Sequence, residues 1–335
     1  MKKKICIFKI GSLGDTVVTL PFFHKINEIH KTSEKYLLFN TSKNPNNPIN
    51  ASSILKNSTL VDKFIEYKID NFKDKVDLFF KIKNIHFDEL YYLVPRTNLF
   101  QVIRDFIFFK LAGVRKVYGL PFKKKFRENK KIKESNCIER ETERYQRCLN
   151  FDNLKLNDFT NWSLKINNKE KIIARKIIKE MDISKRETII LHIFGKRDGK
   201  GYWFENNWKR IIKFLDNFNL KLNICFVGSK HESLKVKQIM STIKKQNKYN
   251  FCGSNTRIFS EVVKYSTLFI GHDSGPLHLA NLNKINTIGI HGGFDHPNKW
   301  FSYNPKSFIF HGYDDVNNVN LSKVKKKIIQ ILHNL

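Results

Sequence analysis

The sequence predicts an α/β protein built from two doubly wound domains that face a central cleft. Short apolar runs rich in β-branched residues alternate with helical segments, which is typical of parallel sheets covered by helices. This alternation occurs twice, in two series separated by a polar stretch at about 152–170. The chain has 335 residues, of which 41% are hydrophobic, and this is enough for two domains with cores of their own.

The first series covers residues 1–165. Strands are expected where apolar residues run together, at 4–10, 35–40 and 88–94. Helices are expected at about 15–30, at 99–113 and near 139–150. Pro21 lies inside the first helix and should bend it, because proline removes a backbone hydrogen bond. The strongly basic stretch 115–147 is expected to be an exposed loop up to the last of these helices.

The second series covers residues 166–320 and is followed by a helical segment at 321–335. Strands are expected at 188–194, 221–228, 249–253, 267–273 and 286–293. Helices are expected at 205–218, from about 231, at 257–266 and from 275. Ser322 can serve as the N-cap of the final helix.

The composition restricts the classes of partner. Lys and Arg number 61 against 31 Asp and Glu, so the formal net charge is +30. Nucleic acid, an anionic membrane surface and phosphorylated substrates all suit such a charge, and part of it can also reflect a general abundance of Lys, Ile and Asn. Five scattered cysteines without a CxxC pair indicate a reduced, cytoplasmic protein without a structural zinc site. No run approaches the roughly 18 apolar residues of a spanning helix, so any membrane contact should be peripheral.

The turn after the first expected strand carries two glycines and one carboxylate, Asp15. The carboxyl ends of the strands are where open α/β sheets bind ligands, and glycines let a ligand approach the backbone closely. Asp15 is therefore a candidate functional residue. An acidic residue at a helix N-terminus is also favoured by the helix dipole, so a purely structural capping role is an alternative.

A second turn, within residues 270–282, has the features of an anion site. A strand leads into Asp273, Ser274 and Gly275, and a helix that begins with a proline follows. The free N–H groups of the first helical turn, the Ser274 hydroxyl and His278 one turn later suit a diphosphate. The alternative is an ordinary strand-to-helix turn with a buried histidine.

Two further strand ends contribute candidates. The Gly-rich stretch 194–208 offers Lys196 and Lys200, which can neutralise charge on a leaving diphosphate, although a solvated loop is the alternative. Glu232 follows the strand at 221–228, and an acidic side chain in that place can accept hydrogen bonds from ribose hydroxyls.

Together these stretches resemble glycosyltransferase family 9, the lipopolysaccharide heptosyltransferases. Members open with a strand and a serine-containing turn that ends in Gly-Asp, followed by TxP, matched by residues 12–15 and 19–21. Their second domain carries D-[ST]-G-x-x-H, matched by residues 273–278. The segments LAGVRKVYGL at 111–120 and VGSKHE at 227–232 are similar to family segments, so the likeness covers most of the chain in the right order.

The resemblance implies a GT-B fold of two Rossmann-like domains, with the acceptor bound by 1–165, the nucleotide sugar by 166–320, and a C-terminal helix at 321–335 that can cross back to the first domain. It implies an inverting transfer of a heptose from ADP-heptose to the inner core of lipopolysaccharide or lipooligosaccharide, without metal or cofactor. The chain departs from the family pattern at 200–204 and after residues 291–293. A different nucleotide sugar, carrying a hexose or an amino sugar, is therefore open as the donor.

The resemblance also implies roles for individual residues. Asp15 is the expected catalytic base, which accepts the proton of the attacking hydroxyl. The expected donor-binding residues are Lys196, Lys200, Glu232, Asp273, Ser274, Gly275 and His278. The expected acceptor-binding residues are Ser12, Gly14, Lys123, Lys124, Lys125 and Arg127. The last four lie in a stretch of basic and aromatic residues that suits a phosphorylated lipid A-core acceptor or an anionic membrane surface, with a solvated loop as the alternative. No metal ligands are expected.

The enzyme is expected in the cytoplasm, peripherally on the inner face of the cytoplasmic membrane. A nucleic-acid-binding protein is the rival from another class, because the charge alone permits it. The chain shows no helix-turn-helix or RNP-like signature, and both diphosphate-type turns would be unused in such a protein. Nucleic acid is therefore not an expected partner.

Overall fold

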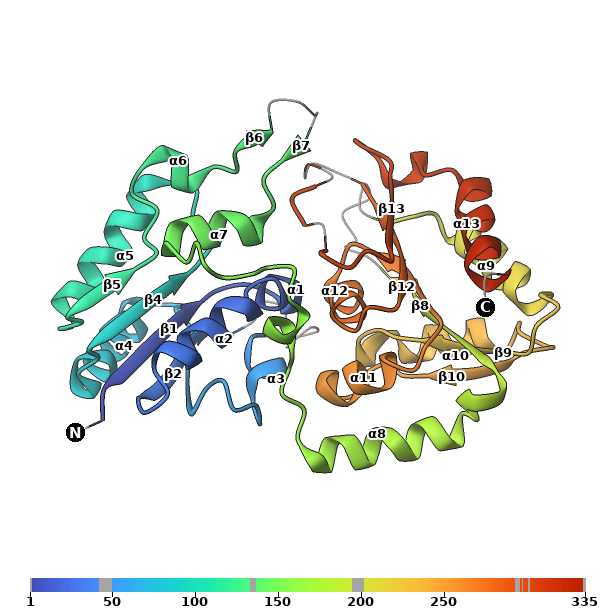
Figure 1. Ribbon diagram of the computed structural model, residues 1–335, viewed down its shortest axis with the longest axis horizontal. Helices are drawn as coiled ribbons and strands as arrows, with labels where there is room; N and C mark the ends of the chain where they lie inside the picture. The colour runs from blue at the N-terminus through green and yellow to red at the C-terminus, as the bar shows by residue number, and fades with distance from the viewer. Residues whose placement is uncertain are drawn as a thin grey trace. The chain divides into compact units, whose positions relative to one another are not determined.

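In the computed structural model the chain folds into two compact units, residues 1–165 with 298–300, and residues 166–297 with 301–335. The structure describes residues 2–41, 50–132, 137–194, 202–292, 296, 298–300 and 302–333. Each unit contains one large parallel sheet with helices packed on it (Figure 1).

The sheet of the first unit has the strand order β3-β2-β1-β4-β5, and every neighbouring pair is parallel. Its strands are β1 (Lys4–Lys9), β2 (Glu34–Asn40), β3 (Lys63–Tyr67), β4 (Glu89–Leu93) and β5 (Lys116–Tyr118). Its helices are α1 (Leu13–Val17), α2 (Leu20–Ile29), α3 (Ser52–Leu55), α4 (Phe72–Ile85), α5 (Leu99–Leu111), α6 (Lys124–Arg127), α7 (Glu141–Leu149) and the 3-10 helix η1 (Phe159–Trp162). A short antiparallel pair, β6 (Lys131–Ile132) and β7 (Cys137–Ile138), precedes α7. The strand order reverses between β1 and β4, so the carboxyl end of β1 lies where such sheets bind ligands.

The sheet of the second unit has the order β10-β9-β8-β11-β12-β13 and is also parallel throughout. Its strands are β8 (Glu187–His192), β9 (Leu222–Phe226), β10 (Asn247–Asn250), β11 (Leu268–His272), β12 (Asn286–His291) and β13 (Ser307–His311). Its helices are α8 (Asn168–Glu180), α9 (Glu205–Asp216), α10 (Ser233–Met240), α11 (Thr256–Val263), α12 (Gly275–Leu282) and α13 (Leu321–His333), with 3-10 turns η2 (Ile183–Lys185), η3 (Lys230–Glu232) and η4 (Val316–Asn318). This is the doubly wound order of dinucleotide-binding folds, whose switch point lies between β8 and β11.

Both sheets are buried on their two faces, which explains the near-continuous apolar strands. Every residue of β9 and β11 is buried, as is typical of parallel sheets covered by helices. In β1, Cys6 and Phe8 belong to a cluster shared with α4 and α5, while Ile5 and Ile7 point to the opposite face and are fully buried. Alternate residues of one strand therefore serve two cores.

The helix expected at 15–30 is two helices, and the expectation for Pro21 was wrong. Val18 caps the end of α1, and α2 begins at Leu20 with Pro21 in its first turn. A proline in the first turn lacks an N–H group that would be unpaired there in any case. Pro21 therefore starts a helix instead of bending one.

Several elements were not predicted from the sequence. Besides the short 3-10 turns, these are β3, β5, β6, β7, β13, α3, α4, α6 and α8. The edge strands are the weakest signals, because β3 and β13 are only partly buried and carry polar residues. α8 is lysine-rich, and its place in the fold depends on a buried ion pair from Arg257 of α11 to Glu170, with N–O distances of 2.7 and 2.9 Å. A contact with a helix 87 residues later is invisible to local pattern reasoning.

The C-terminal helix packs in the second unit. Val324, Ile328, Ile331 and Leu332 of α13 are buried in the core that contains β8, β9, β11 and β12. That residues 321–335 can cross back to the first domain stays a prediction, and the described part of the helix packs on the sheet of its own unit. The apolar side of α13 is already occupied by the sheet of its own unit.

Candidate active site

The turn after β1 holds Asp15 by two hydrogen bonds from Ser12. The Asp15 Oδ2 atom accepts from the Ser12 backbone N–H at 2.6 Å and from the Ser12 hydroxyl at 2.8 Å. The carboxylate therefore takes part in capping α1, as the structural alternative proposed. Within the described residues, no hydrogen bond reaches Oδ1. One oxygen thus fixes the side chain and the other is available to a substrate.

Two glycines shape this turn. Gly11 has φ +130°, and a Cβ atom there would lie 2.7 Å from the Asp15 Cβ and Oδ2 atoms. Any side chain at this position would displace Asp15 and would also strain the backbone. Gly14, an expected acceptor-binding residue, is buried inside α1, whereas Ser12 is exposed at its N-cap.

A buried cation lies at the end of β1, close to Asp15. The Lys9 amine is almost fully buried, donates to the Ile10 carbonyl at 3.0 Å and lies 5.8 Å from the ring centre of Tyr145. Burial lowers the pKa of Lys9 to about 8, although Asp15 and Glu141 act in the opposite direction. Lys9 was not among the functional residues expected from the sequence, where the one unusual feature was a lysine inside an apolar strand.

The turn after β11 presents the start of α12. Ser274 is the N-cap residue in an extended conformation, and within the described structure its side chain makes no capping hydrogen bond. Instead its hydroxyl donates to the His272 carbonyl at 3.0 Å and lies 3.0 Å from His192 Nδ1. A hydroxyl has one hydrogen, so the His192 Nδ1–H donates to Ser274 when that carbonyl bond is made. The first N–H groups of α12 remain available to an anion.

Four strands of this sheet end in histidine, which the sequence analysis did not notice. They are β8 with His192, β11 with His272, β12 with His291 and β13 with His311. Burial lowers the pKa of His192 to about 4 and that of His272 to about 3, and it also lowers the pKa of His291. These three imidazoles are therefore neutral at physiological pH. The carboxyl end of the sheet offers neutral polar groups beside the N-terminus of α12.

Glycines in the strands make room for two of these histidines. A Cβ atom on Gly271 would lie 2.8 Å from the Cβ atom of His192, and one on Gly289 would lie 2.7 Å from His291 Nε2. Glycine in a strand interior weakens the strand, and it often marks a close approach of another group. Here the group that approaches Gly271 is the Cβ atom of His192, and the group that approaches Gly289 is the imidazole of His291.

Asp273 stands between two imidazoles. Its Oδ1 atom is 3.6 Å from His278 Nε2, and its Oδ2 atom is 3.9 Å from His291 Nδ1. His291 is held in place by a hydrogen bond from the Gly312 N–H to its carbonyl, at 2.9 Å. The expected donor-binding residues Asp273, Ser274, Gly275 and His278 therefore lie together at one strand end, and His291 joins them.

The remaining expected site residues are less directly placed. Lys196 and Lys200 lie outside the described residues. Glu232 accepts from the Ser229 N–H at 2.6 Å, so the carboxylate caps a 3-10 turn beside Gly228. Lys123, Lys124 and Lys125 are exposed at the start of α6. Arg127 is half-buried and donates to the carbonyls of Pro121 and Phe122, so it supports the loop that carries these lysines.

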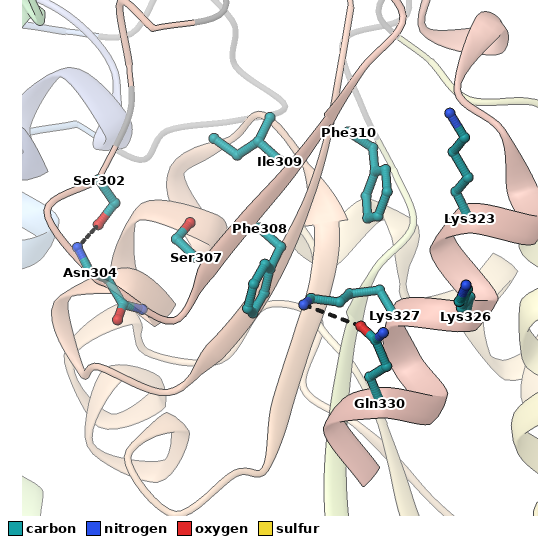
Figure 2. Close-up of a pocket in the computed structure, with 10 residues that line it drawn as sticks. All are labelled: Ser302, Asn304, Ser307, Phe308, Ile309, Phe310, Lys323, Lys326, Lys327 and Gln330. Carbon is teal, nitrogen blue, oxygen red and sulfur yellow. Dashed lines mark hydrogen bonds between the residues drawn. The ribbon is translucent and has the colours of Figure 1, made fainter. Parts of the chain in front are cut away.

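A cavity of about 540 Å³ lies elsewhere in the second unit, along β13 and α13 (Figure 2). Phe308 and Phe310 of the strand face Lys323 and Lys327 of the helix, and Lys327 lies over the Phe308 ring. None of the ten residues that line it was selected as a functional residue. In the described parts of the chain no group of three or more His, Cys, Asp or Glu is arranged to hold a metal ion, and no helix has the length and apolar character to span a bilayer.

A family model identifies the family to which this chain belongs. The model of glycosyltransferase family 9 (heptosyltransferase) matches residues 111–328. Lipooligosaccharide heptosyltransferase 2 of Campylobacter jejuni is 29% identical over 122 residues, which are 34% of this chain and 39% of that protein. The chain thus matches well under half the length of this curated relative.

Solved structures establish the fold. A family 9 glycosyltransferase from Veillonella parvula matches with a TM-score of 0.72 at 12% identity, covering 100% of this chain and 99% of that one. The E. coli ADP-heptose lipopolysaccharide heptosyltransferase II matches with a TM-score of 0.67 at 13% identity, covering 100% and 99%. E. coli heptosyltransferase WaaC with ADP matches at 0.63 and 13%, covering 98% and 99%. The expected GT-B class, with two Rossmann-like sheets, is confirmed.

Proposed function

Because this chain belongs to glycosyltransferase family 9, we propose that it transfers a heptose from ADP-heptose to the inner core of lipopolysaccharide or lipooligosaccharide. The family match over residues 111–328 carries the proposal, since it includes the whole strand-to-helix turn at Ser274. The solved relative that contains ADP supports adenine nucleotides as the donor class.

We assign the donor diphosphate to the N-terminus of α12. Its first N–H groups have no side-chain cap among the described residues, and the helix dipole favours an anion there. A carboxylate repels a diphosphate, so Asp273 is better placed to accept hydrogen bonds from donor hydroxyls, with His278 and His291 facing its two oxygens at 3.6 and 3.9 Å. The helix N-terminus and His278 then stabilise the leaving group, and the mechanism we propose needs no metal ion.

We assign the catalytic base to Asp15. In an inverting transfer the acceptor hydroxyl attacks from the side opposite the leaving diphosphate and must lose its proton there. The free Oδ1 atom of Asp15 can take that proton while Oδ2 stays bonded to Ser12. Such a base typically contributes a factor of about 10² to 10⁴ in rate, which is roughly 3–5 kcal/mol.

The acceptor accounts for part of the net charge of +30. A lipid A-core acceptor carries phosphates and lies at an anionic surface, and the exposed Lys123, Lys124 and Lys125 offer three adjacent cations for it. We therefore propose that the enzyme works in the cytoplasm, peripherally bound to the inner face of the cytoplasmic membrane.

A thermal-shift screen with ADP, UDP, GDP and their sugars tests the donor. A ligand at about 100 times its Kd adds about 2.7 kcal/mol to the free energy of unfolding, so we expect a clear rise in Tm with ADP and ADP-heptose. A rise with UDP-sugars or GDP-sugars alone would favour a hexose or amino-sugar transferase of the same fold. Filter binding tests the rival class, because tight and strongly salt-dependent binding of DNA or RNA would favour a nucleic-acid-binding protein.

A further inference from the structure

Helix α5 exposes a row of large apolar side chains. Leu99, Ile103, Ile107 and Leu111 recur every four residues along one side of the helix, and all are exposed. Phe100 lies beside this row and is 76% exposed, and Leu111 is 67% exposed. Residues four apart are neighbours on a helix surface, so the row is continuous. We call these five residues the α5 row.

The side chains of the α5 row are not part of the hydrophobic core of the first unit. The inner side of α5 already contributes Phe109 to the cluster shared with β1 and α4, and Val102 on the same helix is fully buried. A helix that is apolar on all sides is normally buried in a protein or a membrane, and a contiguous exposed apolar patch normally marks an interaction site. α5 has 13 residues, which is too short to cross a bilayer. The exposed side of α5 is therefore suited to contact with another surface, and the helix is not suited to crossing a bilayer.

Basic residues border the α5 row. Phe122 extends the apolar surface, because its ring packs edge-on against Phe106 of α5 with centres 5.3 Å apart, and it is itself 41% exposed. The exposed lysines 123–125 follow at once, and α6 lies next to α5 (Figure 1). From 99 to 128 the sequence has eight Lys or Arg and two carboxylates.

Each of the two carboxylates offsets one cation, so basic residues remain in excess along this border. Asp105 is buried, accepts from the Tyr92 hydroxyl at 2.7 Å and pairs with Arg104 at 2.6 Å. Glu128 lies 3.8 Å from Lys124 within one helical turn. The exposed surface is therefore apolar in the middle and positively charged along its edge.

We propose that the α5 row and residues 122–125 dock the first unit on an anionic phospholipid bilayer. The apolar side chains enter the boundary between headgroups and acyl chains, and the lysines contact lipid phosphates. A second copy of the chain is the less favourable occupant, because pairing the same patch would bring two basic borders together. This surface contains no donor-site residue. The docking proposal rests on the proposed function only because that function gives a reason for membrane contact.

Flotation with phosphatidylcholine vesicles, with and without phosphatidylglycerol, tests the proposal on the full chain. The test variant is Phe100→Gln with Leu111→Gln. Its matched control is Leu234→Gln with Ile172→Gln, which removes apolar side chains that are 74% and 63% exposed on α10 and α8 of the second unit. A second test variant replaces Lys123, Lys124 and Lys125 with Gln. All these side chains are exposed, so the fold should survive, and circular dichroism checks this.

We expect the wild-type chain and the control to float with the anionic vesicles. The Phe100→Gln/Leu111→Gln variant should lose at least about tenfold in partition coefficient, because two large apolar contacts are removed. The triple lysine variant should lose the salt-sensitive part of binding, which disappears near 1 M salt, where the screening length is about 3 Å.

Three results would overturn the proposal: no flotation of the wild-type chain, equal flotation of the apolar test variant, or an equal loss in the control. A dimer in solution that only the apolar test variant dissociates would assign the surface to a second copy instead. Flotation does not depend on turnover or on nucleotide binding, so its outcome is separate from that of the donor screen.

Discussion

The double use of the Asp15 carboxylate leads to a specific prediction for Asp15→Asn. The amide oxygen of Asn can accept both hydrogen bonds that Ser12 now donates, at 2.6 and 2.8 Å, so the cap should survive. Asn and Asp are comparable N-terminal capping groups, and the lost charge at the helix dipole costs about 0.3–1 kcal/mol. The free Oδ1 atom, however, is replaced by an NH₂ group that cannot accept a proton.

We expect kcat to fall by about 10² to 10⁴, roughly 3–5 kcal/mol of transition-state stabilisation, while the free energy of unfolding falls by less than about 1 kcal/mol. The assay is release of ADP from ADP-heptose with a heptose-free acceptor, with chemical denaturation measured in parallel. Isothermal titration with ADP should give the same Kd as for the wild-type chain.

Two control variants separate the functions of the carboxylate. Asp15→Ala removes both the base and the cap, so it should lose a similar amount of activity and about 1 kcal/mol more stability than Asp15→Asn. Ser12→Ala removes one of two hydrogen bonds to Oδ2 and should retain most of the activity. A kcat within a few-fold of the wild-type value for Asp15→Asn would refute the assignment of the base.

Three further predictions concern buried polar groups. His291→Phe should weaken ADP-heptose binding about tenfold and leave ADP binding unchanged. His291→Asn keeps an N–H near the Nδ1 position that faces Asp273, so it should bind ADP-heptose nearly as the wild-type chain does. Titration calorimetry measures the ratio of the Kd for ADP-heptose to the Kd for ADP, and equal ratios in all variants would contradict the role of His291. Arg257→Ala leaves Glu170 charged and buried, so the free energy of unfolding, measured by denaturant titration, should fall by about 3–5 kcal/mol. A smaller fall in the double variant Arg257→Met with Glu170→Gln would confirm that the buried charge is the cause. Burial lowers the pKa of Lys9 to about 8 from its ordinary 10.5, so between these pH values the unfolded chain binds one more proton than the folded chain, and the free energy of unfolding rises with pH. The stabilisation by Lys9→Met should therefore shrink from about 3 kcal/mol below pH 8 to near zero above pH 10.5. A difference between variant and wild type that does not change with pH would refute the assignment.

The sequence predicted the turns at Asp15 and Ser274 because each signal is local. An apolar strand, a glycine or a serine, and the start of a helix follow one another within about fifteen residues, and parallel-sheet topology brings such turns to the ligand-binding edge. The central strands of the two sheets could be predicted for the same reason, since a fully buried strand is a continuous apolar run.

What the sequence did not predict depends on contacts between distant residues. The nearness of Asp273 and His291 follows from β11 and β12 being neighbours in a fixed register, and no local pattern specifies that pairing. The edge strand β13 is half-exposed, and its five residues include only three apolar ones, so its sequence pattern is not distinct from that of a loop. The α5 row was recognised only as part of an apolar helix, because exposure is a property of the folded chain.

The central proposal is that this chain transfers a heptose from ADP-heptose to the inner core of lipopolysaccharide or lipooligosaccharide. The most direct test is to incubate the purified chain with ADP-heptose and a heptose-free acceptor, with and without EDTA, and to determine the product by mass spectrometry and NMR. We predict one added heptose, an anomeric configuration inverted relative to the donor, and a rate that EDTA does not change. Retention of configuration, or no transfer by a folded chain that binds ADP-heptose, would contradict the account.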